Sequence, residues 1–412
     1  MTDLQARLEE LEELGVHRRM RLVSGPQGPR VVLDGKPVLV LCSDNALGLA
    51  DHPRVREAAA DAAMRWGVGT GAPRVACGTM TVHRRLEERL AAFSGTQSAL
   101  LFGSAYLAAV GAIPALAREG GVVFCDELNH AALLDGCRLA GARAVLYHHN
   151  DVEHLAWAAE RSGTRSGVVV TESVFATDGD LAPLEDLVEL ADQLDLRLVV
   201  DESHALGTVG PGGRGAVAEA GLECEIDVVM GTLGGALGSY GGFVACDAQT
   251  AKTLTACART LLYSTAPSPP VVAAALAALD LVEEQPRRLD KLHANALVLR
   301  EELAREGFDV AGTETQIVPV IVGEGSVALR MCELALEDGV FAQPIRPPAV
   351  PAGTARLRLA VMASHTKAEL RDAARVLGRA ALRAGFRPGA GLPMAAAQIT
   401  DEWAALPAAE AA

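Results

Sequence analysis

The stretch VVMGTLGGALGSYGGF, residues 228–243, joins a β-branched apolar run to a loop with six glycines. The run predicts a buried strand, and the glycines predict turns or a close approach of backbone to a ligand. Glycine-rich loops at strand ends often bind phosphate through backbone N–H groups. Between Met230 and Tyr240, however, no side chain carries a charge or serves as a general base. The stretch therefore predicts a binding loop and leaves open what chemistry takes place over it.

Strand-like and helix-like segments alternate on both sides of this loop. Short apolar runs occur at 98–102, 121–125, 143–148, 167–172, 196–202 and 226–231, and helical patterns at 53–66, 80–93, 152–163 and 184–195. Strands that alternate with helices of this length indicate a mainly parallel sheet. The sequence thus predicts an α/β fold whose large domain has helices on both faces of the sheet.

The chain divides into four expected parts. Residues 1–46 read as an N-terminal helix and a hairpin that turns at Asp34–Gly35, and residues 47–285 as the large domain. Residues 286–385 mix strand and helix patterns, which predicts a small α+β C-terminal domain. A long helical stretch at 269–306 connects the two domains. The Pro/Ala/Gly-rich segment 386–412 is expected to be a flexible tail.

Composition excludes several classes of partner. The net charge of −15 in 412 residues argues against nucleic acid, because phosphate backbones require a basic surface. The sequence contains no apolar run long enough to span a membrane, and its start reads as a charged amphipathic helix. The eight cysteines form no CxxC pair, which predicts buried thiols in a reducing cytoplasm, Cys77 among them. The expected localisation is cytoplasmic.

Polar residues follow the predicted strands where a parallel sheet binds its ligands. Ser104 follows 98–102, His130 follows 121–125, Asp201 and His204 lie at the end of 196–202, and Thr232 follows 226–231. Taken singly, His130 could be a core histidine and Asp201 a helix cap. The spacing of Asp201, His204 and His130 matches no standard zinc pattern, so no metal is expected. Together these residues suit an anionic, aromatic ligand.

The motifs that contain these strand-end residues, together with others along residues 20–384, resemble those of the α-oxoamine synthases. These are pyridoxal 5′-phosphate (PLP) enzymes of fold type I. The family joins an amino acid to an acyl thioester with loss of CO2. It includes 8-amino-7-oxononanoate synthase, 2-amino-3-ketobutyrate CoA ligase, 5-aminolevulinate synthase and serine palmitoyltransferase. The motifs that carry the resemblance are SDNALGLADHP (43–53), GTGAPRVACGTMTVHRRLE (69–87), FGSAYLAAVGA (102–112), DELNHAALLDG (126–136), TESVFATDGDLAPL (171–184), VVDESHALGTVGPGGRG (199–215), GTLGGALGSYGG (231–242), YSTAPSPP (263–270) and IRPPAVPAGTARLRLAVMASHT (345–366).

The resemblance implies a role for each matching residue. His130 would stack on the PLP ring, Asp201 would hold the ring nitrogen protonated, and His204 would contact the phenolic oxygen. Arg358 would bind the amino-acid carboxylate as a bidentate pair, with Asn45 and Arg21 also assigned to the substrate. The phosphate would be bound by Ser104, Ala105, Tyr106, Thr232, and Ser264 with Thr265, the last two from a second subunit of a homodimer.

One position departs from the family in a way that bears on catalysis. The resemblance places the family's Schiff-base lysine at Gly235, which can neither hold PLP covalently nor take up the Cα proton. The four lysines of the chain are Lys36, Lys252, Lys291 and Lys367, and Lys252 is expected to face solvent on a helix. PLP would then bind noncovalently or as an external aldimine with the amino acid.

Three hypotheses remain open. The chain is an α-oxoamine synthase impaired by Gly235, or a non-catalytic family member that acts as a binding or partner subunit, or an enzyme of altered chemistry. Alanines where the family usually has other residues favour a widened pocket; they stand at positions 46, 105, 109, 132 and 176. Neither the amino acid nor the acyl donor, acyl-CoA or acyl carrier protein, follows from the sequence.

Overall fold

A computed structural model describes residues 4–13, 19–117, 119–164, 166–310, 312–347 and 349–389 of the chain. Most of the predicted tail, residues 390–412, therefore lies outside the described residues. Within them, the helix expected at the N-terminus is α1 (Leu4–Glu13). None of the described helices is both long and apolar enough to cross a membrane.

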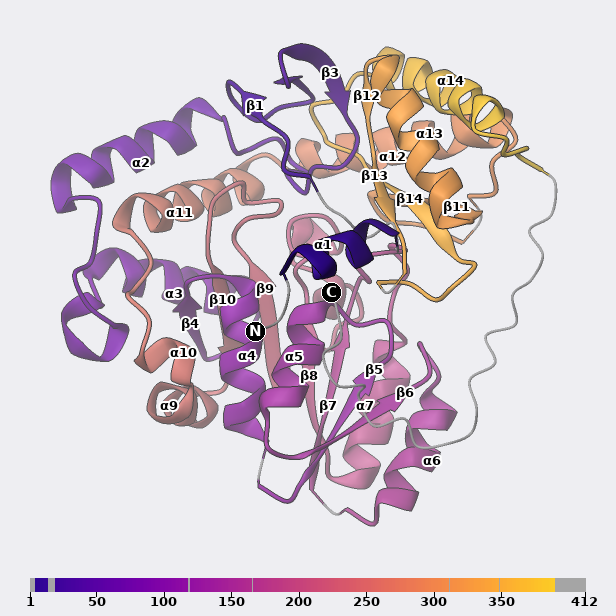
Figure 1. Cartoon of the computed structure of the whole chain (residues 1–412). Helices are drawn as coiled ribbons and strands as arrows, with labels where there is room; N and C mark the ends of the chain where they lie inside the picture. Colours follow the sequence, from indigo (N-terminus) through magenta and orange to yellow (C-terminus); the bar gives the residue numbers. More distant parts are fainter. Residues whose placement is uncertain are drawn as a thin grey trace.

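The centre of the molecule is a seven-stranded sheet (Figure 1). Its order is β4 (Ser98–Phe102), β10 (Gly242–Cys246), β9 (Val228–Thr232), β8 (Arg197–Asp201), β7 (Gly167–Glu172), β5 (Val122–Asp126) and β6 (Arg143–Tyr147). β10 is antiparallel to both of its neighbours, and the other pairs are parallel. The prediction of a mainly parallel sheet is confirmed, and six strands end at the same edge.

Both faces of this sheet are buried. Leu101 and Phe124 pack into one hydrophobic core, while their strand neighbours Leu100 and Val123 pack into another. Alternate residues of a strand point to opposite faces, so a continuous apolar run is what a strand with two covered faces requires. The covering helices of the large domain are α2 (Pro53–Trp66), α3 (Thr81–Phe93), α4 (Ala105–Leu116), α5 (Ala131–Leu139), α6 (Val152–Ser162), α7 (Leu184–Leu194), α9 (Ala248–Cys257) and α10 (Arg259–Leu262).

Short irregular elements join these helices and strands. A π-helical turn covers Arg74–Gly78, a 3-10 turn covers Pro211–Gly213, and α8 covers Ala216–Glu219. The expected long helical stretch is two helices, α11 (Pro269–Glu284) and α12 (Arg287–Arg305). α11 packs against α2 in the large domain and α12 against α14 in the small one. This pair therefore connects the two domains.

The C-terminal part contains a three-stranded antiparallel sheet of β11 (Ile317–Gly323), β14 (Ala355–Ala360) and β13 (Gln343–Ile345). Helices α13 (Gly325–Glu337) and α14 (Lys367–Arg383) accompany it. The N-terminal hairpin is β2 (Arg30–Leu33) and β3 (Lys36–Val40), flanked by β1 (Val23–Ser24). β3 also pairs in parallel with β12 (Val340–Phe341), so the hairpin shares a sheet with the C-terminal part. The four domain boundaries themselves stay a prediction.

The cysteines correct one expectation. All eight are free, but Cys77, Cys224 and Cys257 are exposed rather than buried. Cys77 lies in the π-helical turn, where its neighbours Arg74 and Gly78 take the buried positions. The apolar runs that end at Cys125 and Cys246 do bury their thiols, and burial raises the pKa of the Cys246 thiol to about 12. Lys252 faces solvent on α9, as expected.

Candidate active site

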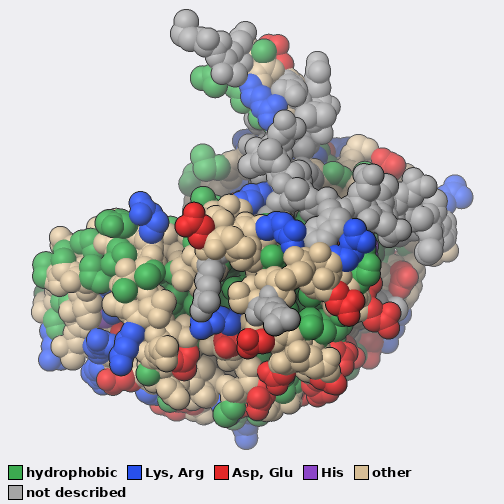
Figure 2. Space-filling view, turned by 90° about the horizontal axis from the view of Figure 1, so that it is seen from below, with side chains coloured by type: hydrophobic (Ala, Val, Ile, Leu, Met, Phe, Trp, Pro, Cys, Tyr) green, Lys and Arg blue, Asp and Glu red, His purple; other side chains and the backbone are tan. Residues whose placement is uncertain are grey.

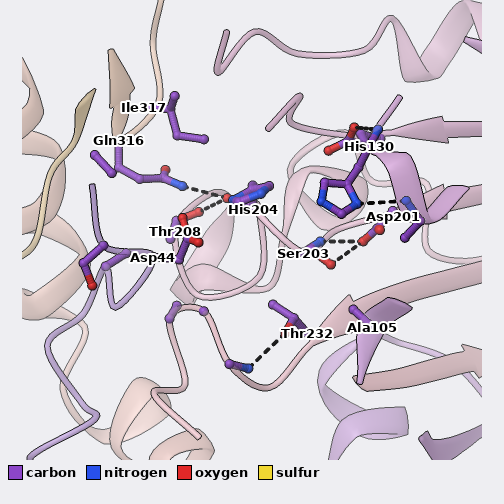
Figure 3. Close-up of a pocket in the computed structure, with 18 of the residues that line it drawn as sticks. Asp44, Ala105, His130, Asp201, Ser203, His204, Thr208, Thr232, Gln316 and Ile317 are labelled. Atoms are coloured by element: carbon purple, nitrogen blue, oxygen red, sulfur yellow. Dashed lines mark hydrogen bonds between the residues drawn. The ribbon is translucent and has the colours of Figure 1, made fainter. Parts of the chain in front are cut away.

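A cavity of about 280 Å³ opens at the edge of the sheet where β7, β8 and β9 end. Its lining comes from strand ends, helix starts and loops of the N-terminal part, the large domain and the small domain (Figure 3). The lining residues are Ser43, Asp44, Ala46, Ala105, Tyr106, His130, Ala132, Glu172, Asp201, Ser203, His204, Thr208, Thr232, Gly234, Gly235, Ala236, Gln316, Ile317 and Ala360. The cavity thus lies where the sequence predicted a binding site, at the carboxyl ends of the parallel strands.

Asp201 is the last residue of β8 and is nearly buried, with 7% of its surface exposed. Its Oδ1 accepts hydrogen bonds from the backbone N–H of Ser203 at 2.8 Å and from the Ser203 hydroxyl at 2.6 Å. Two donors on one oxygen fix the plane of the carboxyl group and leave the other oxygen to face a ligand. This is the arrangement that a cationic ring nitrogen requires.

His130 stands at the start of α5, and in Figure 3 it lies above Asp201, with His204 to the left of both. Its Nδ1 accepts a hydrogen bond from the backbone N–H of Ala132, and its own backbone N–H donates to Glu172 Oε1. Glu172 also accepts from the backbone N–H of Ala176. The contacts with Glu172 and Ala132 hold the imidazole over the cavity. Because Nδ1 accepts a hydrogen bond, Nε2 is the ring nitrogen that can donate one.

His204 is fixed through its backbone rather than its ring. Its carbonyl oxygen accepts from the Thr208 hydroxyl at 2.6 Å and from Gln316 Nε2 at 2.8 Å. Burial and the nearby Arg358 guanidinium lower the pKa of the His204 ring to about 4. The ring is therefore neutral at pH 7, and it can donate to or accept from a ligand oxygen without adding charge.

The N-terminus of α4 closes a further side of the cavity. Ser104 caps this helix, and its Oγ accepts from the backbone N–H of Leu107 at 3.1 Å. Ala105 and Tyr106, in the first turn, line the cavity, and the Tyr106 hydroxyl donates to Asp135 at 2.7 Å. A helix N-terminus presents backbone donors and a partial positive charge, which suits a phosphate group.

The glycines of the loop after β9 serve two different purposes. A Cβ at Gly238, where φ is +61°, would lie 2.3 Å from the backbone nitrogen of Ala50, and one at Gly242 would lie 2.4 Å from that of Ala105. These two positions need glycine. The three atoms nearest to a Cβ at Gly235 would be Thr232 Cγ2 at 3.2 Å, the Ser203 carbonyl oxygen at 3.4 Å and the Asp44 carbonyl oxygen at 3.8 Å, of which only the first is a tight contact. Gly235 thus lines the cavity at a position whose backbone accepts a side chain.

Arg358 lies in β14, and its side chain is 8% exposed. Its Nη2 donates to Asp44 Oδ1 at 3.0 Å, and its Nε donates to the carbonyl oxygen of Ala176. Asp44, which is half-exposed, lines the cavity, whereas Arg358 stands behind it. Burial raises the pKa of Asp44, but the charge and hydrogen bond of Arg358 together with the nearby His204 and His130 outweigh it, so the pKa lies below its usual value.

Other predicted site residues lie outside the lining of the cavity. Asn45 is buried, and its Oδ1 accepts from the backbone N–H of Ala50, which makes it a support of the loop. Arg21 pairs with Asp34 in the N-terminal hairpin at 2.9 Å. Ser264 and Thr265 follow α10, where Thr265 is exposed and bridges to Pro73. Ser104 and Arg358 are also not part of the lining. The roles assigned to all the predicted site residues, inside and outside the lining, stay predictions.

Sequence reasoning missed several residues of the cavity. Asp44 and Ser203 sit beside residues that the motifs had singled out, and a wider reading of the same motifs would have included them. Gln316 and Ile317 enter from the small domain at the start of β11, and no local pattern marks them. Among the described residues, no three His, Cys, Asp or Glu side chains are placed to bind a metal ion.

Comparison with known proteins gives the class first. Residues 36–377 match the family described as aminotransferase class I and II. The chain belongs to this PLP-dependent family and has its fold type I architecture, so the fold and the family resemblance are confirmed.

The named relatives are α-oxoamine synthases. The chain is 47% identical over 375 residues to 8-amino-7-oxononanoate synthase of Geobacter sulfurreducens, which covers 90% of this chain and 96% of the relative. It is 48% identical over 366 residues to that of Geobacter metallireducens, covering 88% and 94%. A serine palmitoyltransferase from S. paucimobilis, a lysine-to-alanine variant with a bound PLP–myriocin aldimine, superposes with a TM-score of 0.87 at 32% identity, covering 93% of this chain and 97% of that one.

Proposed function

We propose that this chain binds PLP and an amine substrate in the cavity as an α-oxoamine synthase, and that condensation with an acyl thioester is impaired because position 235 carries no lysine. The observation that carries the proposal is the difference between the glycines of one loop. A Cβ at Gly238 or Gly242 would overlap backbone atoms, while a Cβ at Gly235 would line the cavity with one tight contact, to the Thr232 methyl group at 3.2 Å. The backbone at position 235 is therefore suited to a side chain that the sequence lacks.

The residues present fit PLP. Asp201 offers a carboxyl oxygen to the ring nitrogen, His130 offers a flat ring above the cavity, and the start of α4 offers backbone donors to the phosphate. When bound, PLP supplies an electron sink for charge that develops at the substrate Cα. A cavity of about 280 Å³ is close to the lower end of the range of ligand pockets, roughly 300–1,000 Å³.

Each residue around the cavity has a separate role in this proposal. Ser203 orients Asp201 so that the ring nitrogen keeps its proton. The neutral His204 ring, placed by Thr208 and Gln316, exchanges a hydrogen bond with the ligand oxygen nearest to it. Moving a proton at the substrate Cα requires a base with a pKa near the working pH. A glycine at 235 offers no such base, which is the step that limits this chain.

The first test is the binding of PLP to the purified protein and to a Gly235→Lys variant, followed by absorbance. Both proteins are expected to give a saturable PLP signal. After borohydride reduction, only the variant is expected to retain a pyridoxyl mass increment, and with an amino acid and an acyl-CoA only the variant is expected to turn over.

Gly234→Lys is the matched control, because Gly234 is exposed on the same loop and also has room for a Cβ. A pyridoxyl increment in the Gly234 variant alone would place the lysine position elsewhere and contradict the proposal. No PLP signal in any of the proteins would favour the alternative function, that of a non-catalytic partner subunit.

We also propose a cytoplasmic homodimer in which Ser264 and Thr265 reach the neighbouring cavity. Large apolar side chains are exposed on the elements near these residues, with Met64, Val68 and Tyr263 at 89, 75 and 72%. Figure 2 shows hydrophobic side chains gathered at the left of one face, with acidic and basic ones interspersed elsewhere. Light scattering is expected to give twice the chain mass of 42.9 kDa.

A further inference from the structure

The only cation that contacts a charged residue of the cavity lining, among the described residues, is already bound within the chain. Arg358 donates from Nη2 to Asp44 Oδ1 at 3.0 Å and from Nε to the carbonyl oxygen of Ala176. Its side chain is 8% exposed, whereas that of Asp44 is 52% exposed. A ligand entering the cavity therefore meets the carboxylate of this pair before the guanidinium.

The geometry of the pair also limits how Arg358 can bind a second carboxylate. A guanidinium holds a carboxylate with two parallel N–H groups, either Nε with Nη2 or Nη1 with Nη2. Asp44 takes one N–H of Nη2 and the Ala176 carbonyl oxygen takes the N–H of Nε, so the Nε/Nη2 edge is occupied. The edge that remains is Nη1 with the second N–H of Nη2. A carboxylate bound there would lie beside the carboxylate of Asp44, which repels it.

The other charged groups around the cavity do not favour the binding of a ligand carboxylate. Its lining contains Asp44, Glu172 and Asp201 but no lysine or arginine among the described residues. Burial raises the pKa of Glu172 well above its usual value, and His204 is neutral. Asp44 is thus the charged group nearest to the Arg358 subsite, and it attracts a cation and repels an anion.

We propose that Asp44 fills the carboxylate subsite of Arg358, so that this site selects primary amines whose carboxyl group is absent or masked as an amide or ester over free amino acids. Asp44 is then the residue that determines which amine enters. The inference rests on the proposed function in taking the cavity as the PLP and amine site, and it goes further by naming the amine. It adds a second departure, independent of Gly235, that works against decarboxylative chemistry, which needs the free carboxylate.

The test compares two ligands of the same size, L-alanine and L-alaninamide, in the wild-type chain and in Asp44→Asn. Binding to the PLP-loaded protein is followed by absorbance, and binding to the PLP-free protein by calorimetry. The wild-type chain is expected to bind L-alaninamide about tenfold more tightly than L-alanine, and Asp44→Asn is expected to reverse this preference. Because the ratio is compared between variants, the different basicity of the two amines cancels.

Asp178→Asn is the matched control. Asp178 pairs with Arg356, two residues before Arg358 in the same strand, but it does not line the cavity. This variant is expected to keep the wild-type preference. Asp44→Ser, which also lacks the charge, should behave as Asp44→Asn does, so a folding defect in one variant does not decide the result.

The outcomes separate the two proposals. An equal ratio in the wild-type chain and Asp44→Asn, or a wild-type preference for L-alanine, would overturn the inference while PLP still binds. Absence of PLP binding would overturn the proposed function, and the calorimetric ratio in the PLP-free protein then decides the inference. If neither ligand binds to either form of the protein, the inference is also wrong.

Discussion

Gly235 and Gly238 lie three residues apart in one loop, and they predict opposite responses to the same substitution. At Gly235 the φ angle lies outside the left-handed region and the nearest neighbour of an added Cβ is a methyl group 3.2 Å away. Replacing glycine by alanine there reduces the freedom of the unfolded chain by about 0.4–1 kcal/mol, offset by that tight contact. Gly235→Ala is expected to change the free energy of unfolding by less than about 1 kcal/mol.

At Gly238 the same change combines a left-handed backbone with a contact 2.3 Å from the Ala50 nitrogen. We expect Gly238→Ala to lower the free energy of unfolding by about 2–5 kcal/mol, from strain and overpacking together. Urea unfolding of both variants measures the difference. If Gly235→Ala proved as costly as Gly238→Ala, position 235 would need glycine for folding and would not be a vacated side-chain position.

Single residues also show how far the sequence could predict the site. His130, Asp201, His204 and Thr232 could be placed because each follows an apolar strand, and parallel strands end at one edge. The pairing of Asp44 with Arg358 spans 314 positions of sequence and depends on how two domains pack. No local pattern contains that information. The carboxylate role expected for Arg358 came from the family alone, and the residue that occupies its donors was not foreseen.

At the scale of single elements, one buried ion pair ties three of them together. Arg74, in the π-helical turn, contacts Glu87 of α3 at 2.8 Å, with both side chains nearly buried. Arg74 also donates to the carbonyl oxygen of Leu101 in β4, and Glu87 accepts from the backbone N–H of the same residue. Glu87→Gln would leave a buried guanidinium without its counter-charge, so we expect a loss of about 3–5 kcal/mol in the free energy of unfolding.

The control for this prediction is an exposed pair on the same helix. Arg89 of α3 contacts Glu283 of α11, with side chains 37 and 49% exposed. Glu283→Gln is expected to cost no more than about 1 kcal/mol in urea unfolding, because solvent screens such pairs. Equal losses in the two variants would mean that burial does not set the strength of the Arg74 pair.

The sequence predicted whether a segment is a helix or a strand better than it predicted the direction in which a strand runs. The helical pattern at 53–66 gave both ends of α2, since Pro53 starts the helix and Gly67 follows it. The run at 242–246 is as apolar as its neighbours but was not among the predicted strands, and β10, which it forms, is antiparallel to β4 and β9. Apolar periodicity measures how buried a strand is and not which way it runs. The direction follows from the turn through residues 233–241, where Leu233 N–H donates to the Gly241 carbonyl oxygen.

At the scale of the whole molecule, the loop after β7 links the two domains. Asp178 of this loop pairs with Arg356 of β14, and the Gly179 carbonyl oxygen accepts from the Thr315 hydroxyl, so both contacts reach the small domain. On the large-domain side, Asp180 accepts from His149 Nε2 at 2.8 Å, and His149 Nδ1 contacts the buried Asp126 at 3.0 Å. His149 therefore holds the loop to the end of β5 between two carboxylates.

This arrangement predicts how stability depends on pH. Burial alone would lower the pKa of His149, but the hydrogen bonds to Asp126 and Asp180 outweigh it and raise the pKa to about 10. In the unfolded chain the pKa is about 6.5. The folded state thus binds the extra proton between these values, and the stability that His149 contributes is complete below pH ~6.5 and is lost as pH rises toward ~10.

The measurement is urea unfolding of the wild-type chain and His149→Gln at several pH values between 6 and 10. The variant is expected to be less stable at pH 6, because Asp126 keeps a buried charge without its partner, and the difference is expected to shrink as pH rises. His148→Gln provides the control, since His148 lies one residue away, its ring stacks on His154, and its Nδ1 is 3.8 Å from the carboxylate of the partly exposed Glu127. A difference for His149→Gln that stays constant over this range would show that the histidine acts by packing against Phe175 rather than by its charge. The loop would then be held to the small domain by Asp178 and Thr315, and the connection between the domains would not respond to pH.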